Sequence, residues 1–571
     1  MHLIAPIRSC IDEILEITGS GLKSMILDEF TTGVVGSSYT RSEMLLREVY
    51  LFEYINTIFE STERLSQMKC IVILRSSKDN VENLCRELKR PHYRTYHIYF
   101  TSRLGSTTIQ KLAEADEREV VRCVRELPIN FQPITPFLFS LKLINKTYDL
   151  RSDDWQTDGL RICTEGLAST LIALRVNPYI RYQTQSRLCK ILAEKVGNHI
   201  KNESFRNINW RKVAPFDKDS LLLIVDRRID LISPIINKWT YYAMIHEFFD
   251  IQGNNRINLV DVPNRQAKDP KEMLISMEND QFFQDNYNKN YGELGTIFKM
   301  AIEDLKTVTK SSNKIETMED MRKFIDEYPE TKRYASNLHN HVFLMSEISR
   351  LVTEHHLLSV SECEQELACS LISDSEIIKK IKQLVASDMI SPNDALRLCC
   401  LYSVCTKAGQ RNSIIGDLLK LLKNRKDIKK SDLDIVKQIR EFSRSKPQNQ
   451  LDEKVEQVAR KIVQGVKGVD NVLTQYKPHL SKLLDGLKRS YRLKEVEFAF
   501  SGERYKEEAP KRVIIFFVGG LTYDEAILVD QFNRSNRETK VIVGGTTMHN
   551  FRSFIGEVRE AILYGNESAP S

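Results

Sequence analysis

The spacing of apolar residues divides the first part of the chain, up to about residue 140, into alternating strand-like and helix-like segments. Short apolar runs predict strands at residues 23–28, 70–74, 96–100 and 136–141. Apolar positions at helical spacing predict helices at residues 4–17, 41–48, 79–89 and 107–127. Since strands that alternate with helices pair in parallel and carry helices on both faces, this part predicts an α/β domain.

The rest of the chain carries strand patterns at two widely separated places. One is the apolar run at residues 221–225, after which residues 240–480 show mainly helical spacing. The other is at residues 513–518 and 541–543, on either side of a helix predicted at 523–533. These two late strands are too few for a sheet of their own, so we expect them to join the strand at 221–225. The second α/β domain is therefore predicted to be discontinuous, with an all-helical block inserted in it.

Composition narrows the class of protein. A chain of 571 residues has room for three or four domains. Its 83 Lys and Arg against 77 Asp and Glu form no basic stripe, which argues against a nucleic-acid partner. The 11 cysteines lack zinc spacing, so we expect reduced thiols and no metal. No signal peptide or membrane span is predicted, because acidic residues interrupt the apolar N-terminus and no apolar run reaches the roughly 20 residues of a span.

Charged residues directly after the strand at 221–225 are the first candidates for chemistry. Asp226 and Asp230 stand four positions apart with two arginines between them, which suits an ion-paired turn better than a catalytic pair of carboxylates. The glycine pairs at 519–520 and 544–545 follow strands, but neither continues into a phosphate-binding motif. We therefore predict no enzyme and no cofactor. A nucleotide-binding α/β enzyme and a generic helical scaffold remain the alternatives.

The stretch from residue 220 to 250 resembles the signature of the SM (Sec/Munc-like) family of SNARE regulators. An apolar strand leads to Asp226–Arg227, then to Asp230, Ser233–Pro234 and Trp239, and ends in TYYAMIHE. Other family-like motifs are LAEADE at 112–117, EQELA at 364–368, FFVGGLTYDEA at 516–526 and VIVGGTTMHN at 541–550. The resemblance extends in order along nearly the whole chain.

The resemblance implies a three-domain arch, in which two parallel-sheet α/β domains carry a large helical domain inserted in the second. The implied boundaries are residues 1–132 for the first domain, 133–245 and 481–571 for the two parts of the second, and 246–480 for the helical third. The third domain is divided at about residue 362. This arrangement agrees with the discontinuous domain predicted from the apolar pattern.

The same resemblance implies a binding function. Proteins of this family bind a Qa-type syntaxin and promote SNARE complex assembly, and the motifs here look most like a trans-Golgi and endosomal branch. The implied partners are that syntaxin, the assembled SNARE bundle and a vesicle R-SNARE. The implied location is cytoplasmic, on Golgi and endosomal membranes through the SNAREs, with no direct membrane contact.

Three groups of site residues also follow from the resemblance. A groove for the N-terminal peptide of syntaxin is expected along one helix, with about half of the residues facing the sheet: Leu112, Ala115, Val120, Val121, Val124 and Leu127. Pro329 matches a proline near the tip of a helical hairpin that templates the vesicle SNARE, although an ordinary loop proline is the alternative. A structural domain junction is expected at Asp226, Arg227, Asp230, Pro234 and Trp239.

Overall fold

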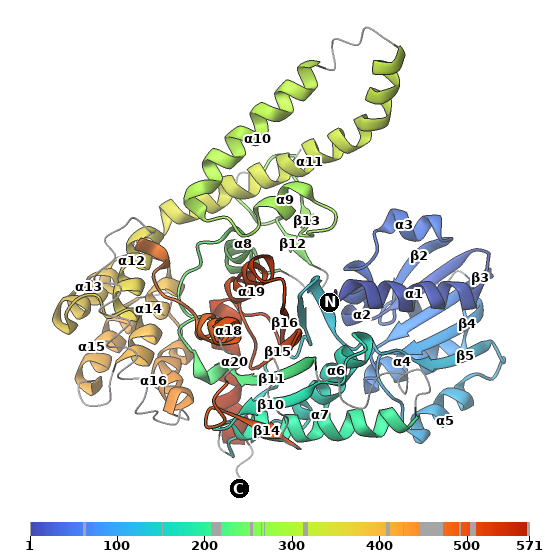
Figure 1. Cartoon of the computed structure of the whole chain (residues 1–571), viewed down its shortest axis with the longest axis horizontal. Coiled ribbons are helices and arrows are strands. Elements are labelled where there is room, and N and C mark those ends of the chain that lie inside the picture. The colour runs from blue at the N-terminus through green and yellow to red at the C-terminus, as the bar shows by residue number, and fades with distance from the viewer. Residues whose placement is uncertain are drawn as a thin grey trace.

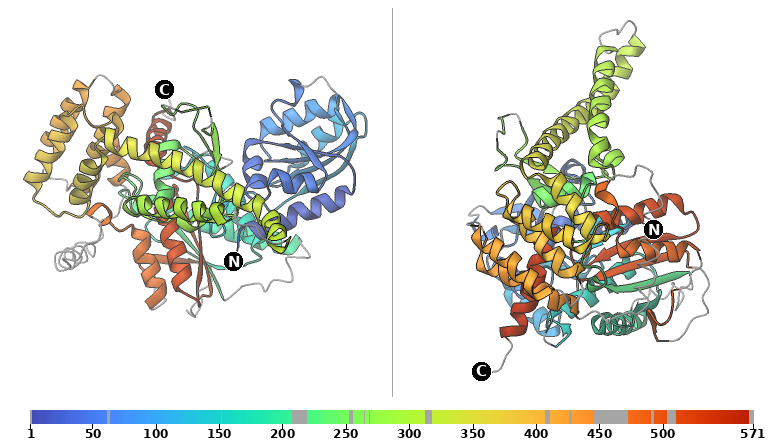
Figure 2. Two further views of the ribbon diagram at one scale, coloured as in Figure 1. Left: turned by 90° about the horizontal axis from the view of Figure 1, so that it is seen from above. Right: turned by 90° about the vertical axis from the view of Figure 1, so that its left-hand side faces the viewer.

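The computed structural model has an α/β part at one side, a second sheet in the centre and a block of helices at the other side (Figure 1). A helical hairpin, α10 with α11, projects from this body, as a second direction of view also shows (Figure 2). The residues described are 2–60, 64–150, 152–206, 219–251, 255–263, 265–267, 269–311, 318–406, 411–425, 428–444, 472–489, 493–502 and 510–567.

The first sheet, sheet A, has five parallel strands in the order β2-β1-β3-β4-β5. Its strands are β1 (Lys23–Leu27), β2 (Val49–Tyr54), β3 (Leu65–Leu74), β4 (Tyr93–Phe100) and β5 (Val121–Glu126). Its helices are α1 (Ile4–Thr18), α2 (Glu29–Gly36), α3 (Arg41–Leu46), α4 (Lys78–Lys89) and α5 (Ser106–Ala115). Buried side chains of α1 and α2 share one core with the sheet, and those of α4 and α5 share another. The predicted α/β architecture is confirmed.

The second sheet, sheet B, has seven strands in the order β14-β10-β11-β15-β16-β7-β6. These are β6 (Gln132–Thr135), β7 (Leu138–Ser140), β10 (Tyr179–Gln183), β11 (Ser220–Asp226), β14 (Phe498–Ser501), β15 (Arg512–Val518) and β16 (Lys540–Gly545). Strand β11 pairs in parallel with β15 from Ser220–Arg512 to Asp226–Val518. The late strands therefore join the strand at 221–225, as predicted, and the residues between β11 and β14 form an insertion.

Four helices pack with sheet B: α6 (Gly159–Ala173), α7 (Arg187–Arg206), α19 (Tyr523–Ser535) and α20 (Phe551–Glu567). Strand β10 was not predicted, because residues 158–205 have an overall helical pattern. Its sequence YIRYQ has no apolar run. At its centre Arg181 is nevertheless buried, and its Nη2 donates to the carbonyl oxygens of Leu493 (2.7 Å) and Phe498 (2.8 Å).

The inserted block is largely helical. Its helices are α8 (Tyr241–Phe249), α9 (Gln281–Asn286), α10 (Tyr291–Ser311), α11 (Met318–Glu354), α12 (Leu357–Ala368), α13 (Asp374–Ala386), α14 (Pro392–Cys405), α15 (Arg411–Asn424), α16 (Lys430–Arg444) and α18 (His479–Arg489). A short antiparallel ribbon, β12 (Arg256–Asn258) with β13 (Glu272–Leu274), was not predicted. Within the described residues, no helix is both long and apolar enough to cross a bilayer.

Candidate functional site

The predicted junction segment is buried where it leaves sheet B. Asp226, the last residue of β11, pairs with Arg228 (Nη2 to Oδ2, 2.8 Å) and accepts hydrogen bonds from Tyr148 Oη (3.0 Å) and Ser186 Oγ (2.6 Å). Burial by itself raises the pKa of Asp226, but the charge of Arg228 and the hydrogen bonds from Arg228 and Ser186 outweigh it and lower the pKa below its ordinary value. Both carboxylate oxygens of Asp226 bind protein groups, so Asp226 connects the end of β11 to Tyr148, Ser186 and Arg228.

Arg227 connects the same segment to the C-terminal part of the chain. Its Nη1 lies 2.8 Å from both carboxylate oxygens of Glu525, in the first turn of α19. Glu525 also accepts the backbone N–H of Thr522 (2.9 Å) and so completes a capping box at the start of that helix. One buried carboxylate thus caps the start of α19 and neutralises Arg227, which directly follows β11.

Asp230 connects the junction segment to residues next to α18, near the end of the inserted helices. It accepts hydrogen bonds from Tyr476 Oη (2.8 Å) and from the backbone N–H of His479 (2.9 Å), at the start of α18. Burial would raise the pKa of Asp230, but the charge of Arg227 and the hydrogen bonds from Ser233 and from the backbone of His479 hold it well below its ordinary value. Arg227 Nη2 lies 3.5 Å from the Asp230 carboxylate.

The remaining junction residues lie against helix α12. Pro234 and Trp239 are both buried, and Trp239 Nε1 donates to Ser361 Oγ on α12 (3.0 Å). Between them the backbone N–H of Asn237 donates to Glu364 on α12 (2.8 Å). The predicted residues therefore lie together in one structural seam, which joins sheet B to the inserted helices.

The glycines at the strand ends are covered by side chains of the protein. A Cβ atom on Gly519 (φ +88°) would lie 2.0 Å from Tyr148 Oη, and one on Gly520 (φ +81°) would lie 2.5 Å from the ring of His549. The space above β15 is therefore filled, and these glycines offer no cradle for a phosphate group. This removes the sequence argument for a nucleotide site at this place.

The predicted peptide groove is not built on one helix, which corrects the expected helix at 107–127. Helix α5 ends at Ala115, and the chain then turns through Glu119 at a positive φ of 51° before β5 begins. Asp116 accepts the backbone N–H groups of Val120 (2.9 Å) and Val121 (3.0 Å) and so stabilises this turn. The signal that was missed is an aspartate directly after the helix, whose carboxylate accepts hydrogen bonds from the backbone four and five residues later.

A bulge in β5 nevertheless brings most of the predicted residues to one face. Val121 pairs with Tyr96 and Val124 pairs with Ile98, with a register shift between them. Paired residues of parallel strands point to the same face, so both valines lie on the side that α5 covers. Leu112 and Ala115 of α5 are buried in that core, and Val120 packs at its border.

Leu127 differs from the other five, because it packs against the core on the opposite side of sheet A. The apolar side chains that remain accessible on the α5 side are Val124, 42% exposed, and Ile109, 50% exposed. Ile109 was not predicted, although it stands one helical turn before Leu112. Strand β5 is also the outermost strand of sheet A, so its outer backbone edge has no strand partner among the described residues.

Pro329 lies within α11 (Met318–Glu354), not in a loop. Its side chain is outside the described part of the structure. Figure 1 shows that α11 changes direction along its length. A proline inside a helix lacks the N–H of one helical hydrogen bond and is a common cause of such a bend.

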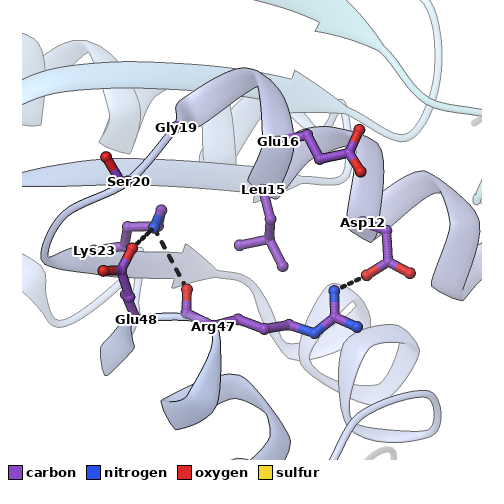
Figure 3. Close-up of a pocket in the computed structure, with 8 residues that line it drawn as sticks. All are labelled: Asp12, Leu15, Glu16, Gly19, Ser20, Lys23, Arg47 and Glu48. Atoms are coloured by element: carbon purple, nitrogen blue, oxygen red, sulfur yellow. Dashed lines mark hydrogen bonds and ion pairs between the residues drawn. The ribbon is translucent and has the colours of Figure 1, made fainter.

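A depression of about 490 Å³ lies between the end of α1 and the end of α3 (Figure 3). Lys23 points into it, and its Nζ contacts Glu48 Oε2 (2.9 Å) and the carbonyl oxygen of Arg47 (3.4 Å). Arg47 in turn pairs with Asp12. Both cations of this depression are therefore paired, and Glu16 leaves its lining with one excess negative charge.

Comparison with known proteins agrees with this architecture. The Sec1 family model matches residues 23–557. The vacuolar protein sorting-associated protein 45 of Homo sapiens is 36% identical over 100% of this chain and 98% of its own, and that of Dictyostelium discoideum is 34% identical over 98% and 96%. A solved structure described as the SM protein Vps45 in complex with the Qa SNARE Tlg2 superposes with a TM-score of 0.86 at 31% identity, covering all of both chains. The resemblance seen in the motifs is thus confirmed, and the chain belongs to the Sec1 family of SM proteins.

Proposed function

We propose that this protein binds a Qa-type syntaxin and promotes SNARE complex assembly during vesicle docking and fusion at trans-Golgi and endosomal membranes. One observation carries the proposal: the whole chain superposes on the SM protein Vps45 solved with the Qa SNARE Tlg2. The role is binding rather than catalysis. Contact with the membrane is indirect, through the SNAREs, so the protein is peripheral on Golgi and endosomal membranes.

The first contact in this proposal is with the N-terminal peptide of the syntaxin, at the surface formed by α5 and β5. Ile109 and Val124 supply accessible apolar area there. The outer edge of β5 offers backbone donors and acceptors to an extended peptide, as in other cases of strand addition. A hydrophobic anchor of the peptide would cover the two side chains while its backbone extends sheet A.

The second contact is with SNARE helices, on the helical block. The hairpin of α10 and α11 projects far enough from the body to lie alongside another helix (Figure 2). Pro329 biases this hairpin toward its bent form, and the extended form would receive a vesicle R-SNARE. Two sites on one partner raise the overall affinity, because binding at the first increases the effective concentration at the second.

A pull-down with immobilised cytosolic regions of several syntaxins tests the proposal. The purified chain is expected to bind one Qa-type syntaxin of the trans-Golgi and endosomal pathway and to accelerate SNARE assembly in a liposome fusion assay. A syntaxin lacking its N-terminal peptide should bind more weakly but not lose binding entirely. Binding to none of the syntaxins would overturn the proposal.

A further inference from the structure

A cavity of about 750 Å³ lies between α4 and α5, with α6 of the second α/β region at one end. Its volume falls in the range of sites for small ligands, roughly 300–1,000 Å³. Its lining includes neither Ile109 nor Val124 but does include Ala115, so it adjoins the surface proposed for the syntaxin peptide along α5. It is separate from the strand-end glycines of sheet B.

Basic side chains from several elements surround this cavity. Six cations line it against four carboxylates: Lys78, Arg86, Lys89, Arg103, Lys111 and Arg161 against Glu82, Glu114, Glu117 and Glu165. Two cations have partners, since Lys78 lies 3.9 Å from Glu82 and Arg161 lies 3.2 Å from Glu165.

The other four cations, Arg86, Lys89, Arg103 and Lys111, have no carboxylate within 4.0 Å in the part of the chain that the structure describes. They come from both α4 and α5, and from the loop that precedes α5. Glu114 and Glu117 offset part of this charge, and the six cations against four carboxylates leave an excess of two positive charges, which favours an anion placed in the cavity.

The floor and the ends of the cavity suit oxygen-rich anions. Val81, Leu104 and Ala115 are buried and add apolar surface to its lining. Ser76 brings a hydroxyl group from the loop after β3, and Thr108 brings one from the first turn of α5. The loops that follow β3 and β4 lie beyond the carboxyl ends of parallel strands, the edge of such sheets where phosphate ligands bind.

We propose that this cavity binds a ligand with clustered phosphate groups, either a soluble inositol polyphosphate or the head group of a phosphoinositide. Several phosphates on one small ring match several cations around one cavity. Arginine and lysine both bind phosphate oxygens, the former through two parallel hydrogen bonds. Because Arg161 belongs to α6 and the other cations to α4, α5 and their loops, the ligand would bridge sheet A's helices to those of sheet B.

Titration calorimetry with inositol hexakisphosphate tests the site. The Arg103→Glu/Lys111→Glu variant is expected to bind more than about tenfold more weakly than the unchanged chain, and binding should weaken as salt is added. A matched control is Lys379→Glu/Lys423→Glu, which changes the net charge equally at exposed positions on α13 and α15. Equal affinity in the two variants, or no binding to the unchanged chain, would overturn the proposal.

Vesicles distinguish the two sources of the ligand. Co-sedimentation with phosphatidylcholine vesicles that carry phosphatidylinositol bisphosphate, lost in Arg103→Glu/Lys111→Glu, would assign the site to a lipid head group. Binding to inositol hexakisphosphate without co-sedimentation would assign it to a soluble ligand. Tighter binding of a poly-glutamate peptide than of inositol hexakisphosphate, sensitive to the same substitutions, would overturn the proposal in favour of an acidic protein segment.

Discussion

Arg227 Nη1 lies 2.8 Å from both carboxylate oxygens of Glu525, and neither side chain is more than 1% exposed. Arg227 stands at the point where the chain leaves sheet B for the helical insertion, and Glu525 stands after the chain has returned. The pair therefore ties together the two separated parts of the second α/β region. Both ends of the helical insertion join this region, so we expect the pair to help hold the insertion in place.

Removal of one partner of this pair leaves a buried charge without compensation. Arg227→Met is expected to lower the free energy of unfolding by about 3–5 kcal/mol. Urea denaturation followed by circular dichroism measures the loss. The double variant Arg227→Met/Glu525→Gln should lose less than the sum of the two single variants, since it removes both partners of this pair and leaves only Asp230 without its cation. A loss in the double variant that equals the sum of the losses in the two single variants would contradict a direct interaction between Arg227 and Glu525.

The contact between Gly519 and Tyr148 predicts a second loss of stability. Gly519 has a positive φ, and a Cβ atom there would lie 2.0 Å from Tyr148 Oη. Gly519→Ala should therefore lower the free energy of unfolding by about 1–3 kcal/mol, through both strain and overlap. The control is Gly416→Ala on α15, where nothing lies within 4 Å of the added atom. That change should be neutral or stabilising, because alanine favours a helix.

Most of the architecture could be predicted from the sequence, because the central strands of both sheets are apolar runs. The pairing of β11 with β15 followed from two apolar strands that had no other sheet to join. Strand β10 was missed for the opposite reason: buried Arg181 is satisfied by carbonyl oxygens of residues more than 300 positions away, which no local pattern reveals.

The surface formed by α5 and β5 also depends on contacts that the apolar pattern does not reveal. Leu112, Val121 and Val124 were predicted to lie on one helix, and the structure brings them to one face in a different way. Their spacing fits a helix, whereas the structure places Leu112 on a helix and both valines on a bulged strand. Bulges and chain-turning aspartates such as Asp116 depend on local hydrogen bonds, so apolar periodicity does not record them.

Glu364 predicts a dependence of stability on pH. Burial raises the pKa of this carboxyl from 4.5 to about 8, although Arg397 and Asn237 partly oppose the rise. The folded protein then holds a proton that the unfolded chain releases, so the free energy of unfolding should fall as pH rises from about 4.5 to about 8. Glu364→Gln, neutral at every pH, should flatten this slope. Urea denaturation at several pH values within that window measures it, and an unchanged slope would contradict the assignment.

Pro329 predicts an effect on SNARE assembly. Pro329→Ala restores a backbone donor inside α11 and removes a penalty of about 3 kcal/mol for proline in a helix. The hairpin should then favour its extended form and accelerate lipid mixing between liposomes that carry the Qa- and R-SNAREs. A matched control is Pro392→Ala at the first turn of α14, where a proline is tolerated and no hairpin is affected. Equal fusion rates for both variants and the unchanged chain would argue against a templating hairpin.

Ile109 and Val124 predict where the syntaxin peptide binds. Both side chains are accessible and lie on the α5 side of sheet A, so substitution by a charged residue should remove apolar contact without disturbing the core. Ile109→Glu/Val124→Glu is expected to weaken binding of the N-terminal peptide by about 2–4 kcal/mol, as measured by fluorescence anisotropy. Leu112→Arg is a poorer test, because Leu112 is buried and the variant would also lose stability.

The control is Met300→Glu/Met389→Glu, which places the same charges on exposed apolar positions of α10 and of the turn after α13. Peptide affinity that falls equally in both variants would place the binding surface elsewhere, whereas a loss confined to the first would locate the peptide on α5 and β5.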